Sequence, residues 1–249
     1  MGGSRDEVAA ALARGARIGG AEPVPEVSRF TEWTMIDGDL VCRYVWHNLP
    51  DPTGGTARYT LPGTEILRRL GDGDRFETVG EFRNGDDADA MTARWRAAGG
   101  AVAGADGGEL RGIVGWAPEP MPRAADRAEV ERALADFAGR LAAAPVHGDW
   151  APVAALFTDE VRVRDHVVGF VEGRHALHAY ILDGVRRSPF TRYRVGLRLV
   201  DGNRVAVLLR AEGSRGGLDV NVVLHYAGEG RWSYVEVVYN PQEIARVSA

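Results

Sequence analysis

Residues 158–240 contain the pattern that decides the expected fold. The stretch opens with Val161-Arg162-Val163-Arg164-Asp165-His166 and continues through Gly169-Phe170-Val171-Glu172-Gly173-Arg174 into a helical segment at 175–185. It closes with Arg231-Trp232-Ser233-Tyr234-Val235-Glu236-Val237-Val238-Tyr239-Asn240. Apolar runs bounded by Gly, Asn and Asp indicate antiparallel strands. A helix followed by a curled antiparallel sheet, with a carboxylate at its entrance, is typical of a small pocket.

Composition limits the classes of protein to which the chain can belong. The 249 residues are 45% hydrophobic and 26% charged, as in ordinary globular proteins, and allow one or two domains. A net charge of −5 argues against nucleic acid or an anionic membrane as a partner. Cys42 is the only cysteine, which excludes an intrachain disulfide and favours a reducing compartment. With neither a secretory signal nor a membrane-spanning apolar run in the sequence, we expect a soluble, cytoplasmic protein.

The rest of the chain divides at a stretch rich in Gly, Ala and Pro. We predict a truncated unit at 1–98, a linker at 99–124 and a complete unit at 125–249. Periodicity and turn residues predict the elements. The expected helices are 5–16, 86–98, 126–143, 150–157 and 242–247, and the expected hairpins are 30–36 with 40–47 and 59–70 with 76–83.

The two halves share three anchors in the same order, which indicates an internal repeat. Ser4-Arg5 and the following helix match Gly173-Arg174 and the following helix. Asp37-Gly38-Asp39 matches Asp201-Gly202-Asn203, and Gly71-Asp72-Gly73 matches Gly228-Glu229-Gly230. By this alignment the first half lacks everything that matches 126–165. It is then a truncated copy, or its start codon has been assigned too far downstream.

Four short stretches of the second half carry a family resemblance. They are Asp149-Trp150, the run Leu156-Phe157-Thr158-Asp159-Glu160-Val161, Asp165 ahead of Gly173-Arg174, and Tyr239-Asn240-Pro241. The second half resembles the NTF2-like superfamily, in particular SnoaL-like polyketide cyclases, ketosteroid isomerases and limonene-type epoxide hydrolases. In the first half, 59–67 and Glu81-Phe82-Arg83-Asn84 look like the last strands of SnoaL-like domains. The resemblance implies an α+β fold of two NTF2-like cone-shaped units, the first incomplete at its N-terminus. Each cone is a curved antiparallel sheet wrapped on helices.

Asp165 falls where the resemblance places the general base of ketosteroid isomerases. The oxyanion-hole positions of those enzymes read Leu141 and Val222 here, and the last-strand acid of limonene-type hydrolases reads Val237. Without these residues, neither activity can be carried over directly to this chain. The fold alone is also a weak guide to function, because it hosts many chemistries.

Strand alternation gives the late sheet of the second half an apolar face, and the resemblance implies that this face points toward the cavity. This face consists of Val220, Val222, Leu224, Tyr226, Val235, Val237 and Tyr239. Near such a cavity, desolvation would make Asp165 a proton acceptor, and Tyr226, Tyr239 and Tyr180 are candidate hydrogen-bond donors to a ligand. Alternatively, Asp165 is a solvated strand-end residue paired with Arg162 or Arg164.

His166 is a further candidate catalytic residue, although it would point away from Asp165 if the strand continues. His175, His178 and Asp183 lack the histidine spacing of a metal-binding helix, so we predict no metal and no cofactor. In the first half, Glu65 and Glu81 match Val222 and Val237.

Glu65 and Glu81 are candidate binding or acid–base residues, with Arg69 and Arg83 as counter-charges. The alternative is an open face on which they form surface ion pairs of little energetic value. The register of the strand at 40–47 is ambiguous, so neither Arg43 nor His47 is assigned to a pocket.

These patterns predict a protein that binds a small, largely apolar metabolite. If it is an enzyme, the expected chemistry is cofactor-free acid–base catalysis of the isomerase, cyclase, dehydratase or epoxide hydrolase type, with Asp165 as base. The alternative is a non-catalytic ligand-binding or dimerisation module, in which the sheets of the two halves, or of two copies, pair.

Overall fold

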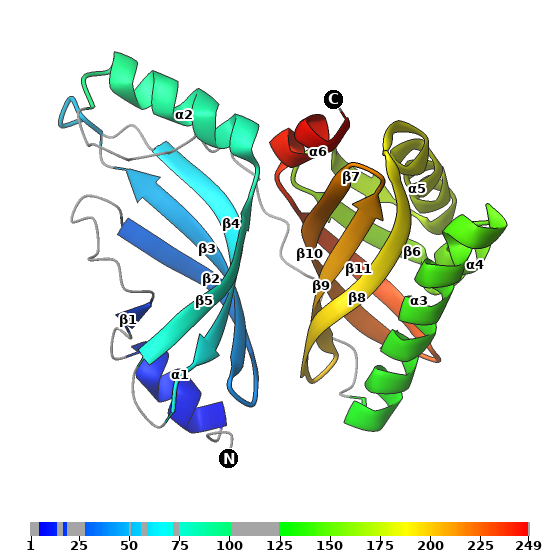
Figure 1. Cartoon of the computed structure of the whole chain (residues 1–249). Helices are drawn as coiled ribbons and strands as arrows, with labels where there is room; N and C mark the ends of the chain where they lie inside the picture. The colour runs from blue at the N-terminus through cyan, green and yellow to red at the C-terminus, as the bar shows by residue number, and fades with distance from the viewer. Residues whose placement is uncertain are drawn as a thin grey trace. The chain divides into compact units, whose positions relative to one another are not determined.

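The computed structural model describes residues 5–13, 17–18, 28–49, 51–55, 59–71, 75–100 and 125–248 (Figure 1). The chain forms two compact units, Met1–Ala117 and Pro118–Ala249. The division falls inside the predicted linker, almost all of which lies outside the described residues. Among the described helices, none is both long and apolar enough to cross a membrane.

The first unit is a five-stranded sheet with two helices. Its elements are α1 (Arg5–Ala13), β1 (Arg17–Ile18), β2 (Ser28–Asp37), β3 (Leu40–Leu49), β4 (Tyr59–Arg69), β5 (Arg75–Arg83) and α2 (Gly85–Ala97). The strand order is β1-β5-β4-β3-β2, with β1 parallel to β5 and the other pairs antiparallel. Both predicted hairpins are confirmed. The tight turn between β2 and β3 places Gly38 at φ 61°, a conformation that favours glycine.

The two helices of the first unit cover opposite ends of one sheet face. Val8 and Ala11 of α1 pack in a cluster with Val41, Leu67 and Phe76. At the other end, Met91 and Trp95 of α2 pack with Leu49 and Leu61. Because side chains alternate along a strand, the residues of β3 and β4 between these clusters on the same face are Arg43, Val45, His47, Gly63 and Glu65.

The second unit is a six-stranded curved sheet with helices. Its elements are α3 (Arg127–His147), α4 (Ala151–Ala154), β6 (Phe157–Asp165), β7 (Gly169–Glu172), α5 (Arg174–Arg187), β8 (Phe190–Asp201), β9 (Arg204–Gly213), β10 (Gly216–Gly228), β11 (Arg231–Val238) and α6 (Pro241–Ser248). The strand order is β7-β6-β11-β10-β9-β8, with β6 parallel to β11. The mixed α+β class with curved antiparallel sheets is confirmed.

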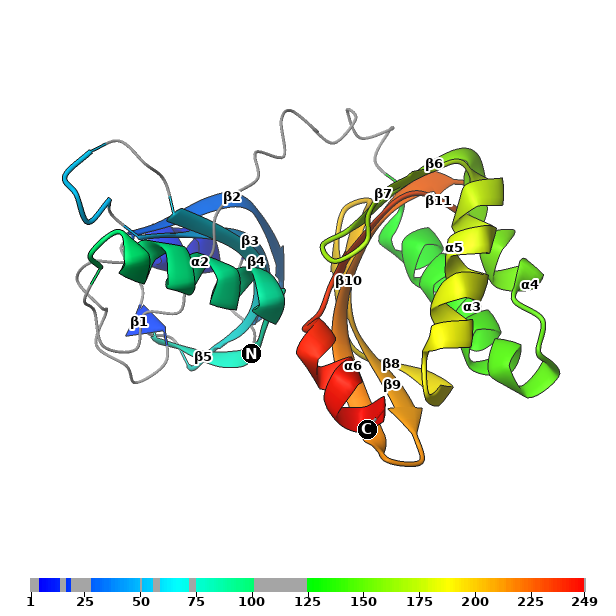
Figure 2. The same cartoon turned by 90° about the horizontal axis from the view of Figure 1, so that it is seen from above.

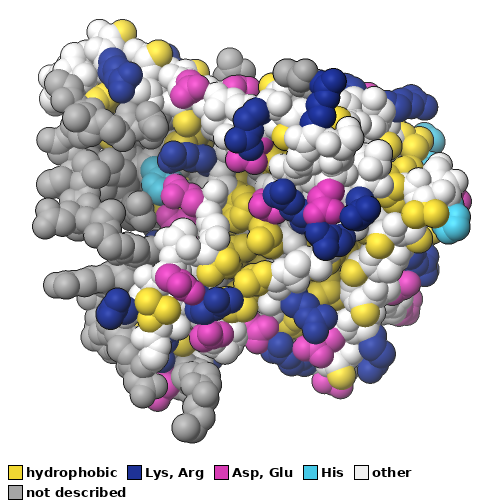
Figure 3. All heavy atoms as spheres, in the orientation of Figure 1, with side chains coloured by type: hydrophobic (Ala, Val, Ile, Leu, Met, Phe, Trp, Pro, Cys, Tyr) yellow, Lys and Arg dark blue, Asp and Glu magenta, His cyan; other side chains and the backbone are white. Residues whose placement is uncertain are grey.

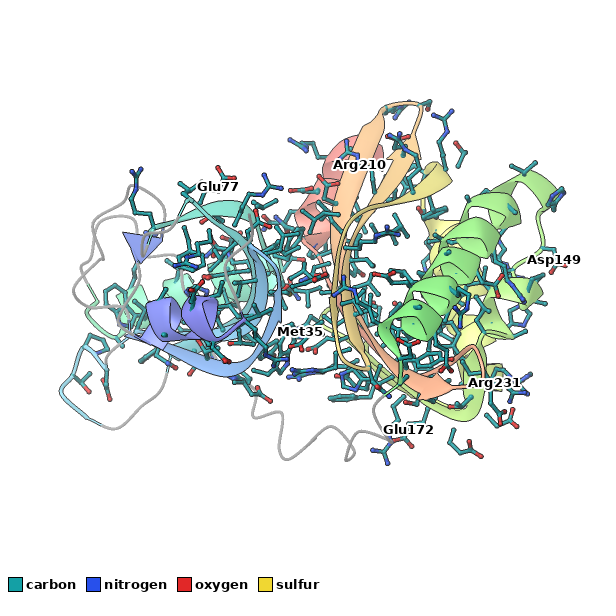
Figure 4. All side chains as sticks on the ribbon, turned by 90° about the horizontal axis from the view of Figure 1, so that it is seen from below. Met35, Glu77, Asp149, Glu172, Arg210 and Arg231 are labelled. Carbon is teal, nitrogen blue, oxygen red and sulfur yellow. The ribbon has the colours of Figure 1, made fainter. Side chains whose placement is uncertain are left out.

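Helices α3 and α5 lie on the concave face of this sheet (Figure 2). Val130, Leu134, Phe137 and Leu141 of α3 are all buried, as their spacing predicts, and side chains fill the space between helix and sheet (Figure 4). The predicted inward face of β10 and β11 is confirmed, because Val220, Val222, Leu224, Tyr226 and Val235 join the core and Val237 and Tyr239 pack against it.

One predicted helix is much shorter than expected. The segment 150–157 forms only the four-residue α4, and Phe157 already begins β6. Phe157 pairs with Trp232 of β11, whose N–H donates to the carbonyl of Leu156 at 2.9 Å. Pairing with a distant strand thus ends the helix, which local periodicity could not indicate.

The two sheets have the same strand order when β1 is matched with β6. Each of these strands lies parallel to the last strand of its meander. In this match α1 precedes the parallel strand, whereas α5 follows it. The predicted equivalence of α1 and α5 therefore does not follow from the topology, and the truncated tandem copy stays a prediction.

Candidate functional site

Asp165 lies at the end of β6, with its side chain on the inner face of the second unit. It is the neighbour of Val237 in the β6–β11 ladder and is only 3% exposed. One carboxylate oxygen, Oδ1, accepts the N–H groups of Val167 and Val168 at 2.7 and 2.9 Å. Oδ2 accepts the hydroxyl of Tyr180 at 2.5 Å. The alternative of a solvated Asp165 paired with arginine is wrong, because its partners are backbone N–H groups and a phenol.

The sequence explains why Asp165 occupies this position. A short turn at 166–168 connects β6 to β7, and the Asp165 side chain caps its N–H groups as aspartates commonly do in turns. Tyr180 lies in α5, which packs against β6. The carboxylate therefore joins a strand end, a turn and a helix.

Two tyrosines keep their protons beside this carboxylate. Burial, and then the charge of Asp165, raise the pKa of Tyr180 well above its usual range. The pKa of Tyr239 is raised by the same two causes in the same order, while Arg187 acts in the opposite direction. Both phenols therefore remain hydrogen-bond donors at neutral pH.

The surroundings of Asp165 and Tyr180 are largely apolar. Val222 pairs with Val237, and Leu224 pairs with Val235, on the inner side of β10 and β11. Partly exposed apolar side chains from α5, β8, β9 and α6 pack against this core. They are Ile181, Leu182, Val185, Tyr193, Val195, Leu209 and Ile244.

The structure separates Tyr226 from Asp165. Tyr226 pairs with Trp232, five residues along β11 from Val237, which corresponds to roughly 16 Å along the strand. Its hydroxyl donates to Glu129 Oε1 at 2.6 Å and accepts the N–H of Gly230 at 2.8 Å. Tyr226 thus ties α3 to the β10–β11 turn and does not belong to the Asp165 site.

His166 points to the opposite face of the sheet, as strand alternation predicts. Its Nε2 lies 2.8 Å from Glu236 Oε1, which is also 3.4 Å from Arg164 Nη1. Tyr234 donates to the other Glu236 oxygen at 3.5 Å, and its ring packs on His225 at 4.6 Å. His166 therefore belongs to a polar cluster on the outer face and is not a catalytic partner of Asp165.

Glu65 in the first unit is buried, with 2% of its surface exposed. Arg43 donates from Nη2 and Nε to Glu65 Oε2 at 2.6 and 2.8 Å. Nε2 of His47 lies 3.9 Å from Glu65 Oε1 and 3.8 Å from Glu81 Oε1. The alternative of an open surface face is wrong for Glu65, whereas the Glu81 side chain is 38% exposed and lies 3.5 Å from Arg83.

Sequence reasoning missed Arg43 and His47. In β3 both faces carry apolar residues, Val41 and Val45 on one side and Cys42 and Tyr44 on the other, and all four are buried. Hydrophobic alternation therefore could not set the register. The first unit has one histidine in its sequence. Figure 3 shows acidic, basic and histidine side chains among the hydrophobic ones on the surface.

The second unit is thus an α+β cone with a buried carboxylate and a phenol on its inner face. The sequence of this unit also matches a known family, because residues 130–238 match the model of the SnoaL-like domain. The resemblance expected for the second half is confirmed.

Several solved structures are similar to part of this chain at low sequence identity. A putative ketosteroid isomerase from Kribbella flavida is 20% identical, with 44% of this chain and 76% of that chain covered and a TM-score of 0.37. A steroid delta-isomerase from Pseudomonas aeruginosa is 18% identical, with coverages of 51% and 89% and a TM-score of 0.39. A de novo designed protein with a curved β-sheet is 17% identical, with coverages of 50% and 95% and a TM-score of 0.41. No curated protein matches the sequence.

Proposed function

We propose that the second unit binds a small, largely apolar metabolite beside Asp165 and transforms it by cofactor-free acid–base chemistry. The observation that supports this most directly is the contact of 2.5 Å between Tyr180 Oη and Asp165 Oδ2, on an inner face dominated by apolar side chains. A proton acceptor and a hydrogen-bond donor therefore lie side by side, where an apolar ligand with one oxygen could reach both.

The roles of the two groups follow from their hydrogen bonds. The turn holds Oδ1, so Oδ2 is the oxygen that would accept a proton from the ligand. The hydroxyl of Tyr180 would then turn from Oδ2 to the ligand oxygen and stabilise the negative charge that develops there. Tyr239 would be a second hydrogen-bond donor to the ligand oxygen. The protonated Asp165 returns its proton to another ligand atom, which completes an isomerisation or cyclisation.

A second candidate function is a non-catalytic binding or dimerisation module. It is favoured by the fact that both Asp165 oxygens already have partners within the protein. In this case Asp165 and Tyr180 anchor α5 to the end of β6, and ligand binding, where it occurs, leaves the ligand unchanged.

Thermal stability with a panel of apolar ketones, lactones and epoxides tests the proposal. A ligand at 100 times its dissociation constant should stabilise the wild type by about 2.7 kcal/mol. We expect turnover of such a ligand to be lost in Asp165→Asn and strongly reduced in Tyr180→Phe. Asn keeps an oxygen for the N–H groups of the turn, and Tyr234→Phe on the outer face is the matched control.

The outcomes separate the candidates. Stabilisation without turnover in the wild type would favour the binding module. Turnover that persists in Asp165→Asn would exclude this carboxylate as the base. If the panel produces no stabilisation, the proposal of an apolar ligand site is contradicted.

A further inference from the structure

We propose that the first unit binds one divalent transition-metal ion between His47, Glu65 and Glu81. The site lies on β3, β4 and β5 and is independent of the function proposed for the second unit. Its three potential ligand atoms lie within 4.8 Å of one another.

The fold brings these side chains together on one sheet face. Glu65 and Glu81 are direct neighbours across β4 and β5, and Glu65 is also the neighbour of Arg43 on β3. His47 lies on the same face as Arg43, four residues further along β3. The cluster occupies the interval between the apolar contacts of α1 and those of α2. Burying polar side chains between two apolar clusters costs free energy unless another interaction compensates them.

The distances fit a bridging cation better than direct hydrogen bonds. Nε2 of His47 is 3.9 and 3.8 Å from the two carboxylate oxygens, beyond hydrogen-bond range for either contact. Zinc bonds to nitrogen and carboxylate oxygen are about 2.0–2.2 Å long, so two ligands of a tetrahedral ion lie roughly 3.4 Å apart. The two His47 contacts would each shorten by about half an ångström, and the two glutamate oxygens, which lie within 4.8 Å of each other, would close by at most about 1.4 Å. The partly exposed Glu81 side chain has room to make that movement.

Two arginines contact the glutamates of the cluster. Arg43 binds Oε2 of Glu65 and so orients Oε1 toward His47, as outer partners of metal-binding carboxylates commonly do. Arg83 lies 3.5 Å from Glu81 Oε1, and both of these side chains are more than one third exposed. A bound ion would displace this weak contact, so that one positive charge replaces another beside Glu81.

The donor set selects the class of metal. One imidazole nitrogen and two carboxylate oxygens suit Zn²⁺, Mn²⁺, Fe²⁺, Co²⁺ or Ni²⁺, whereas soft ions prefer sulfur ligands. Three protein ligands leave at least one coordination position for water or a substrate oxygen, as in catalytic zinc sites.

Metal titration of the untagged full-length chain, after removal of metals with a chelator, tests the site. We expect one equivalent of Zn²⁺ to bind in calorimetry, and one equivalent of Co²⁺ to give visible absorption. Glu81→Gln and His47→Gln should each weaken binding at least tenfold. The matched controls are Glu77→Gln, an exposed glutamate of β5 labelled in Figure 4, and His147→Gln, an exposed histidine at the end of α3. Both controls should bind as the wild type does.

Three results would overturn the proposal. They are the absence of binding with Zn²⁺, Co²⁺, Mn²⁺ and Ni²⁺, binding that is unchanged in Glu81→Gln, and binding that is lost equally in a control variant. Glu81 is partly exposed, so its variant should fold even if His47→Gln does not, and it then decides the question alone. None of these results bears on ligand binding at Asp165.

Discussion

At the scale of single residues, two carboxylates of the second unit show how position decides role. Asp165 of β6 and Glu236 of β11 are both nearly fully buried, at 3% and 2% exposure, but lie on opposite faces of the sheet. Asp165 contacts backbone N–H groups and a phenol, whereas Glu236 contacts Arg164 and His166. Arg164 compensates the charge of Glu236. Among the residues that the structure describes, the partners of Asp165 are backbone N–H groups and a phenol and not a cation, which is why we propose the chemistry at Asp165.

His225 makes stability depend on pH. Burial, assisted by Arg204 and opposed by Glu236, lowers the pKa of His225 from 6.5 to about 4. Between these two values the unfolded chain binds a proton that the folded chain excludes, so the folded state loses stability as the pH falls. The loss should approach about 3 kcal/mol by pH 4, since each pKa unit corresponds to about 1.4 kcal/mol.

Urea unfolding at several pH values measures this dependence. His225→Gln should unfold with a flatter pH profile between pH 6.5 and 4, while the exposed His147→Gln should keep the wild-type profile. Equal profiles for wild type and His225→Gln would show that other groups cause the pH dependence.

At the scale of elements, most of the fold could be predicted because local signals agree with it. Turn glycines and alternating apolar residues located the two hairpins of the first unit, and helical spacing located α3. The errors arose where a distant strand decides the structure. Trp232 draws Phe157 into a ladder and shortens α4, and β4 fixes the register of β3 that its own apolar residues leave ambiguous.

The surroundings of Asp165 could be predicted in part. The family position singled out Asp165 and strand alternation placed Tyr239 on the inner face, whereas neither signal predicts the contact of Tyr180 with Asp165. Tyr226 was grouped with them because it shares their face, but a face says nothing about distance along the strand. His47 and Arg43 needed the strand register, which only the assembled sheet supplies.

The start of α2 depends on one capping side chain. Asn84 accepts the N–H groups of Asp86 and Asp87 at 3.0 and 3.4 Å. Asn84→Ala should therefore destabilise the first unit by about 1 kcal/mol, while Asn84→Ser should cost less because serine also caps helices. Chemical unfolding of the two variants makes the comparison. A stability equal to that of wild type in Asn84→Ala would show that packing of Met91 and Trp95 alone defines the start of the helix.

At the scale of the whole molecule, the two units have similar strand orders but different polar side chains on their sheets. The second unit has the SnoaL-like match and an apolar inner face with one carboxylate–phenol pair. The first unit has a cluster of arginine, histidine and glutamate at the centre of one sheet face. The proposals are therefore separate: an organic ligand in the second unit and a metal ion in the first.

The central claim is that a small apolar ligand binds beside Asp165, and ring-labelled tyrosine NMR tests it most directly. The chain has seven tyrosines, and one titration reports on all of them. A ligand from the panel should shift the ring signals of Tyr180 and Tyr239. The signal of Tyr226, held by Glu129 and Gly230, should stay unchanged. Shifts confined to other tyrosines, with Tyr180 and Tyr239 unaffected at saturating ligand, would contradict the account.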